Sequence, residues 1–256
     1  MELIFHASVR SIRKSHGNAI LGLLINIAQT LTLVAVFFVL FSFLGLRGSG
    51  VRGDFLLYLL IGVFLFMSHV KALNAVVQSE GPTSPMMKHA PMNTIVAIGA
   101  AALGELYIQV LSLLAVLFLY HTAWTPLEVH QPAGAFGMLL VSWFSGAAIG
   151  LVLLALKPWL PNAVKLTAQI ITRMNMIASG KMFMANILPT SVLPWFTWNP
   201  LFHAIDQARG FSFINYNPYH TSVAYPVIVS LILLFLGMMG EFYTRKRVSL
   251  SWSARG

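Results

Sequence analysis

The sequence contains no cysteine and few charged residues. The lack of cysteine excludes disulfide bonds and thiolate metal sites, and it removes the usual indicator of the redox compartment. Charged residues make up 9% of the 256 residues and hydrophobic residues 57%, whereas soluble domains carry about 25% charged residues. So few charges cannot cover a surface that faces water, which excludes a soluble enzyme and a DNA-binding domain. The composition predicts an integral membrane protein with one domain.

The motifs of two kinds of catalytic site are also missing. No GxxxxGK[ST] loop is present to bind the phosphates of ATP. No HExxH motif or dense cluster of histidine and carboxylate residues predicts a metal site. An enzyme within the membrane needs a convergent pair of ionisable groups, and Glu105 is the acid that lies well inside an apolar segment. Glu105 could pair with His69 or Lys71, although we favour a structural hydrogen bond between helices.

Six apolar segments are long enough to cross a bilayer, which takes about 20 residues per helix. They cover residues 19–44, 55–77, 94–120, 133–156, 163–188 and 222–243. These runs lack the alternation of β-barrel strands and therefore predict an all-α polytopic membrane protein with six transmembrane helices. The fifth segment is the least apolar because it carries Arg173 and Lys181.

The basic residues are distributed unevenly between the two ends of these segments. Eleven fall on one side: Arg10, Arg13, Lys14, Lys71, Lys88, Lys157, Lys165, Arg245, Lys246, Arg247 and Arg255. Three fall on the other side: Arg47, Arg52 and Arg209. Because basic loops stay in the cytoplasm, both termini are predicted to be cytoplasmic. Residues 1–18 predict a short interfacial helix on the inner surface, with a flexible tail as the alternative.

Two further features concern packing and partners. Gly146 and Gly150 form a GxxxG motif that permits close helix approach, and we favour a contact within the chain over a dimer contact. Prolines 82, 85 and 91 bracket a segment of one or two helical turns between the second and third apolar segments. We predict that this segment docks on a cytoplasmic partner, with a simple connector as the alternative. The residues assigned to this coupling contact are Ser84, Met86, Met87, Lys88 and His89.

Residues 189–221 are rich in proline, tryptophan and asparagine and are too apolar for an ordinary exposed loop. Apolar stretches of about ten residues that are broken by prolines are typical of re-entrant or interfacial helices. Asn199 as an N-cap and Pro200 at the first helical position predict a helix here. This helix is expected to begin at Leu201 and to end near Gly210.

The residues from 179 to 210 read SG…P…W…NPL.HAID..R. With the basic N-terminal segment and six spans, they resemble the permease subunits of ABC-2 type exporters, and in particular capsular polysaccharide export permeases (KpsM type) and their O-antigen relatives (Wzm type). The Asn199-Pro200-Leu201 step is shared by drug-exporting ABC-2 permeases, whereas residues 215–219 and the chain length favour the capsule branch. Lys181 departs from this pattern, because many relatives carry an apolar residue there.

The resemblance implies a permease subunit that exports a lipid-linked capsular polysaccharide across the bacterial inner membrane. It implies a homodimer, two copies of a separate ABC ATPase that binds ATP and Mg²⁺, and periplasmic and outer-membrane export proteins. This chain would then bind no cofactor, metal or nucleic acid and would have no catalytic residue of its own. The alternatives are an ABC-2 exporter of O-antigen, a drug or a lipid and, from another class, an intramembrane enzyme that uses Glu105 and His69.

A pathway for an anionic glycan needs cations and aromatic rings, because sugar CH groups stack on rings, and ionisable residues within a membrane indicate function. Arg173 and Lys181 are eight residues apart, so one continuous helix would place them about 80° apart on a broad face. The residues assigned to the pathway are Arg173, Lys181, Trp195, Trp198, Phe211, Tyr216 and Tyr219. Structural or gating roles are assigned to Glu105, Asn199, Pro200, Asp206 and Arg209.

Overall fold

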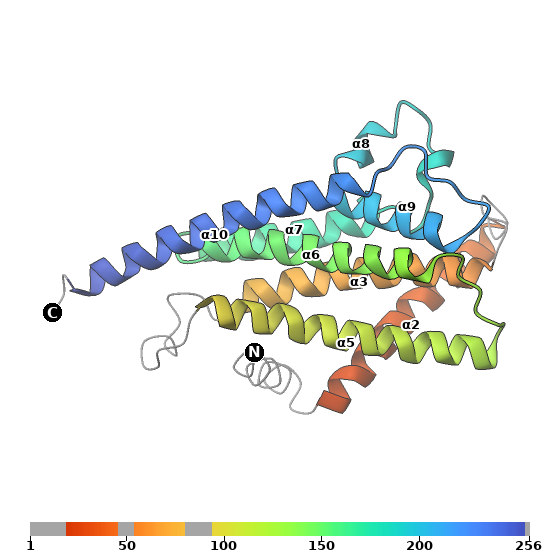
Figure 1. The fold of residues 1–256 in the computed structure, drawn as a ribbon, viewed down its shortest axis with the longest axis horizontal. Helices are drawn as coiled ribbons and strands as arrows, with labels where there is room; N and C mark the ends of the chain where they lie inside the picture. The colour runs from red at the N-terminus through yellow and green to blue at the C-terminus, as the bar shows by residue number, and fades with distance from the viewer. Residues whose placement is uncertain (1–18, 46–53, 80–93, 254–256) are drawn as a thin grey trace.

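The computed structural model describes residues 19–45, 54–79 and 94–253, and within these ranges every regular element is a helix. The long helices are α2 (Ala19–Phe43), α3 (Phe55–Gln78), α5 (Thr94–Ala123), α6 (Pro132–Leu156), α7 (Pro161–Ala178) and α10 (Ala224–Ser253) (Figure 1). The short elements are η1 (Ala185–Ile187), α8 (Pro194–Thr197) and α9 (Pro200–Ser212). The predicted interfacial helix 1–18 and the predicted coupling residues 84 and 86–89 lie outside the described residues.

Five of these helices, α2, α3, α5, α6 and α10, are long and apolar enough to cross a membrane. Each coincides with a predicted apolar segment to within a few residues, apart from the longer C-terminal end of α10. The chain is therefore a helical, multi-pass membrane protein, as its composition predicts. Helix α7, which corresponds to the fifth predicted segment, is not among the five.

Helix α7 ends at Ala178, so the prediction of one continuous helix over residues 163–188 is wrong. Gly180 follows with a backbone φ of 70°, the left-handed conformation in which glycine ends helices. The chain turns here, and Lys181 lies beyond the turn rather than on the same helix as Arg173. The expected angle of about 80° between these two cations therefore does not apply.

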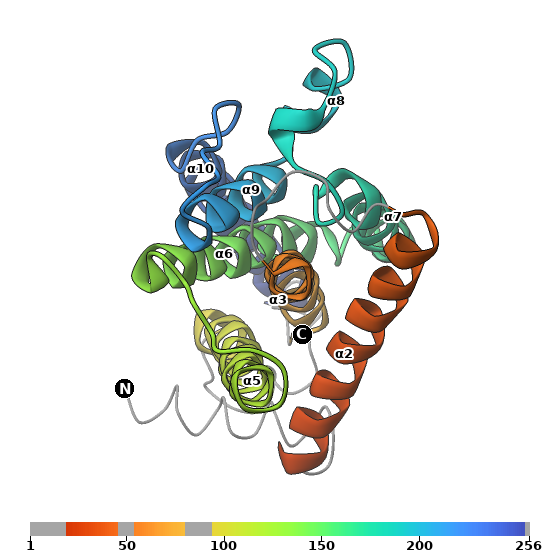
Figure 2. The same cartoon turned by 90° about the vertical axis from the view of Figure 1, so that its right-hand side faces the viewer.

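Helix α3 occupies the middle of the bundle, where α2, α5, α6, α7 and α9 surround it (Figure 2). Most of its apolar length is buried, 78% against 22% for α2. Helix α6 packs closely on α3 through the GxxxG motif, since a Cβ on Gly146 would overlap the carbonyl group of His69. A Cβ on Gly150 would lie 2.7 Å from the Leu73 carbonyl oxygen. The interpretation of this motif as a contact within the chain is confirmed.

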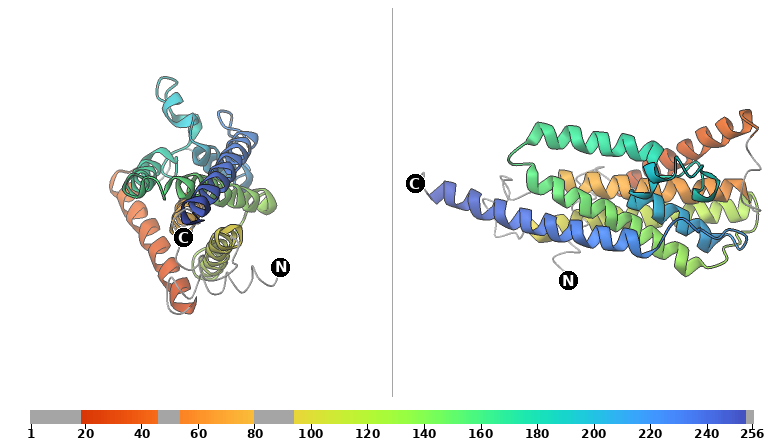
Figure 3. Two further views of the ribbon diagram at one scale, coloured as in Figure 1. Left: turned by 90° about the vertical axis from the view of Figure 1, so that its left-hand side faces the viewer. Right: turned by 90° about the horizontal axis from the view of Figure 1, so that it is seen from above.

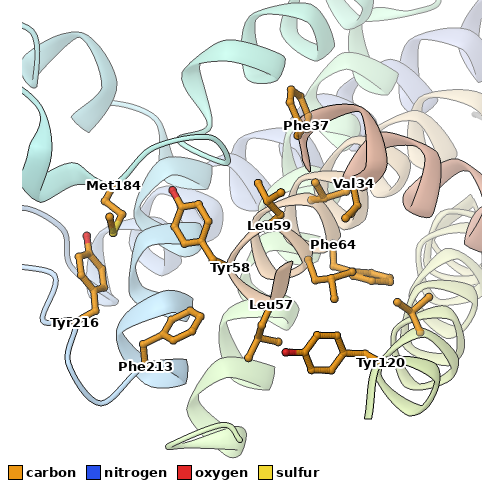
Figure 4. Packing of buried hydrophobic residues seen from close by; sticks show 13 residues of the cluster. Val34, Phe37, Leu57, Tyr58, Leu59, Phe64, Tyr120, Met184, Phe213 and Tyr216 are labelled. Atoms are coloured by element: carbon orange, nitrogen blue, oxygen red, sulfur yellow. The ribbon is translucent and has the colours of Figure 1, made fainter. Parts of the chain in front are cut away.

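Helix α10 packs on the opposite side of α6, where Gly237 lies against Leu151 and Gly240 against Ala155. Its C-terminal part extends beyond the other helices of the described chain (Figure 3). At the other end of the bundle, rings from several elements form an apolar core (Figure 4). This core includes Phe37 of α2, Tyr58 and Phe64 of α3, and Tyr216 from the segment after α9.

The predicted helix after Asn199 is confirmed as α9, which begins at Pro200 and ends two residues beyond Gly210, at Ser212. Helix α9 packs on α3, α6 and α10 and buries most of its side chains. The preceding short helix, α8, projects away from the bundle (Figure 2). Residues 189–221 thus form two helices of very different burial.

Candidate functional site around helix α9

The N-terminus of α9 is tied to the C-terminus of α7 by one side chain. The Asn199 Oδ1 atom accepts a hydrogen bond from the Leu201 backbone N–H at 3.0 Å, which is the N-cap contact that the sequence predicts. The Asn199 Nδ2 atom donates to the Asn175 Oδ1 atom at 2.8 Å and to the Ala178 carbonyl oxygen at 3.0 Å. Asn199 therefore caps one helix and fixes the end of another.

A buried imidazole extends this contact to α3 and α6. The Asn175 Nδ2 atom lies 3.2 Å from His69 Nε2, and His69 Nδ1 lies 2.8 Å from the Ser145 hydroxyl. Since the amide donates to Nε2, the pattern assigns the ring proton to Nδ1. The Ser145 hydroxyl in turn donates to the Ser142 carbonyl oxygen at 2.8 Å. This polar chain, which we call the His69 chain, links α3, α6, α7 and α9.

Asp206 holds three segments together from the buried face of α9. Its Oδ1 atom accepts hydrogen bonds from the Ala185 backbone N–H at 3.2 Å and from the Tyr216 hydroxyl at 2.5 Å. Its Oδ2 atom accepts from the Thr221 hydroxyl at 2.8 Å. Burial and the Asp206 carboxylate both raise the pKa of Tyr216, so the phenol keeps its proton and remains a donor.

Arg209, one turn further along α9, is fully buried and binds the backbone of the turn after α7. Its Nη1 atom donates to the carbonyl oxygens of Gly180 and Phe183, both at 2.8 Å, and its Nη2 atom donates to the Lys181 carbonyl oxygen at 2.6 Å. The guanidinium carbon lies 3.8 Å from the centre of the Tyr58 ring. These contacts make Arg209 a structural residue of the 180–183 turn.

The side chain of Lys181 points away from that turn and is 1% exposed. Its Nζ atom lies 3.7 Å from the centre of the Phe66 ring on α3 and 5.1 Å from the centre of the Phe37 ring on α2. Among the described residues, no oxygen accepts a hydrogen bond from this ammonium group. A cation that is buried against rings alone has lost most of its hydration.

The residues assigned to the pathway are not gathered on one surface. Arg173 is exposed on α7, whereas Lys181 is buried. The Phe211 ring packs against Gly134 of α6. The exposed aromatic side chains are Trp195 (76%), Trp198 (54%) and Tyr219 (76%). The structure therefore brings Tyr216 to Asp206 and the Lys181 backbone to Arg209. It places Trp195 and Trp198 on or directly after α8, and Tyr219 in the segment after α9.

A second polar cluster lies between α2, α3 and α5. Asn26 is its centre, because it donates to the Ser112 hydroxyl at 2.7 Å and accepts hydrogen bonds from Gln109 at 3.0 Å and from Lys71. Gln109 also donates to Glu105 at 2.9 Å. We call this the Asn26 cluster. Asn26 and Gln109 are not among the candidate residues predicted from the sequence, although polar residues inside apolar segments are a signal that could have found them.

Glu105 and His69 belong to these two separate polar networks, so the structure does not form the pair that an intramembrane enzyme would use. Glu105 is joined through Gln109 to Asn26 and thence to Lys71, which agrees with a role in helix packing. Within residues 19–45, 54–79 and 94–253, no three histidine or carboxylate side chains converge as they would around a metal ion.

No family model matches this chain, and no curated protein matches it.

Proposed function

We propose that this protein is the permease subunit of an ABC transporter that exports a lipid-linked capsular polysaccharide across the bacterial inner membrane. Two copies would form the permease and would bind two copies of a separate ATPase. Both termini would lie in the cytoplasm, which requires α7 to be a sixth crossing beside the five long apolar helices, and α9 would serve as a re-entrant helix. Other cargoes of ABC-2 exporters, such as an O-antigen, a drug or a lipid, are the alternatives within the same class.

One observation carries this proposal: the two ends of the segment that resembles the exporters, the turn at Gly180 and helix α9, form one buried unit within a multi-pass membrane protein. Gly180 gives the turn after α7, Asn199 caps α9, and Arg209 returns to bind the turn. Asp206 joins the same unit to the segment that follows α9. The residues of the motif thus support one another, as expected if the motif specifies a local structure and not a chance similarity.

A lysine in this unit supports a pathway for an anionic cargo. A buried ammonium group is costly within a membrane, and among the described residues the Lys181 ammonium contacts two aromatic rings and no hydrogen-bond acceptor. The exposed rings of Trp195, Trp198 and Tyr219 offer faces on which sugar CH groups can stack. Arg173 adds an exposed cation on α7.

Reconstitution tests the proposal directly. The purified chain should hydrolyse no ATP alone, and with the ATPase encoded beside it the complex should hydrolyse ATP. Deletion of the chain from cells should abolish the surface polysaccharide and leave lipid-linked glycan at the inner membrane. Normal surface polysaccharide in the deletion strain would contradict the proposal that the cargo is a capsular polysaccharide. ATP hydrolysis by the chain alone would contradict the proposal that it is a permease subunit with a separate ATPase.

A further inference from the structure

Lys181 carries a charge that the structure uses for no polar contact within the described part of the chain. Its Nζ atom is buried and faces the rings of Phe66 and Phe37. Cation–π contacts contribute less than the hydrogen bonds and ion pairs that usually hold a buried ammonium group. An anionic oxygen would bind this group more strongly than either ring does, if it could reach it.

Helix α2 forms part of the cover over Lys181, because Phe37 belongs to that helix. The buried positions of α2 include Asn26, Thr30, Val34 and Phe37, which form one stripe along the helix. The rest of its surface is largely exposed, in contrast to α3. Helix α2 also crosses the bundle obliquely and packs on it along one side (Figure 2). It can therefore move with a smaller loss of packing than α3.

We propose that α2 covers a concealed anion-binding site whose cation is Lys181, and that displacement of α2 carries Phe37 away and exposes the ammonium group. The anionic group would be a phosphate or carboxylate of the cargo, a part of the proposal that rests on the proposed function. The covering of Lys181 by α2 does not rest on it. The two parts can therefore fail separately.

The absence of native cysteine allows a direct measurement of this site. In the full chain in lipid nanodiscs, Phe37→Cys places a thiol beside Lys181. Its rate of reaction is measured with an anionic and a cationic methanethiosulfonate reagent of similar size. We expect slow labelling with both, and a rate roughly tenfold higher for the anionic reagent, as unit charges about 5 Å apart in water predict. Val34→Cys, on the same buried stripe, provides a milder substitution if Phe37→Cys does not fold.

Two second substitutions assign the effect to its cause. Lys181→Gln should bring the ratio of the two rates close to one, whereas Lys165→Gln, which removes an exposed lysine of α7, should leave the ratio unchanged. A ratio near one with Lys181 intact, in both the Phe37→Cys and Val34→Cys chains, would overturn the anion site.

Asn26→Ala tests whether α2 moves as a unit. Asn26 lies eleven residues before Phe37, roughly 16 Å along the helix, and contacts Ser112 and Gln109 of α5. Its replacement should raise both labelling rates at position 37 severalfold and leave their ratio unchanged. Unchanged rates would overturn the movement of α2.

Normal polysaccharide export by the Lys181→Gln chain would contradict the binding of cargo at this site, even where the labelling ratio holds.

Discussion

Arg209 offers the most direct test of how the α9 site is held together. Arg209→Ala removes three hydrogen bonds to the carbonyl oxygens of Gly180, Lys181 and Phe183. It also removes the contact with the Tyr58 ring. We expect this substitution to destabilise the fold far more than the removal of an exposed arginine does.

The magnitude follows from the contacts. A hydrogen bond from a charged donor contributes about 1.5–3 kcal/mol, but the cavity left by the guanidinium can admit water to some of the three carbonyl groups. We therefore expect a loss of about 3–5 kcal/mol in the free energy of unfolding, which is less than the sum of three such hydrogen bonds. The loss for Arg209→Lys should lie between that for Arg209→Ala and zero. An ammonium group keeps the charge but lacks the planar fork that reaches three oxygens.

The assay is unfolding of the purified chain in mixed micelles by increasing detergent, followed by tryptophan fluorescence. Arg173→Ala is the matched control, since Arg173 is exposed, and its cost should stay within about 0.5 kcal/mol. If the Arg209→Ala and Arg173→Ala chains unfold at the same detergent concentration, the three carbonyl groups have found other donors. The structural role derived for Arg209 would then be wrong.

Three further predictions concern packing, cargo and topology. Gly146→Ala should lower stability by about 1–3 kcal/mol in the same assay, because its Cβ overlaps the His69 carbonyl group, whereas Gly137→Ala, with nothing within 4 Å, should not. Arg173→Ala should reduce surface polysaccharide per assembled complex severalfold and Arg173→Lys should retain much of it; unchanged export would remove Arg173 from the pathway. An impermeant thiol reagent should label Ser49→Cys from outside intact cells and not Ser251→Cys, and the reverse pattern would overturn the predicted orientation.

Much of the fold follows from the sequence, because lipid imposes a simple rule on helix length. Long apolar runs predict the five spanning helices, since a bilayer leaves few other structures for such segments. The cap formed by Asn199 and Pro200 predicts α9, because capping depends on neighbouring residues alone. Both kinds of signal are local in the sequence, and both are confirmed.

The fifth segment shows where local signals fail. Its apolar residues continue past Ala178, but Gly180 adopts a left-handed conformation and the chain turns. The turn is held by Arg209, which lies 28 residues beyond Lys181. A contact over that distance depends on how α7 and α9 pack, which no periodicity in the sequence expresses.

In the candidate site, too, some contacts follow from local signals in the sequence and others depend on how the helices pack. The sequence predicts structural or gating roles for Asn199, Asp206 and Arg209, and the structure binds all three to the chain between Asn175 and Ala185. The burial of Lys181 against Phe37 and Phe66 depends on two other helices and was not foreseen. Which polar groups meet inside a membrane is decided by packing, because each group takes whichever partner the neighbouring helices supply.

The central position of α3 has a consequence for synthesis of the chain. His69 binds Asn175, which lies 106 residues later in the sequence. At about 5–20 residues per second, the ribosome delivers this partner roughly 5–20 s after His69. During that interval α3 carries an imidazole into the membrane without its α7 partner, and lipid tails cannot supply a hydrogen bond. The most deeply buried of the five spanning helices is therefore among the first to be made, and its imidazole gains its partners only when α6 and α7 arrive.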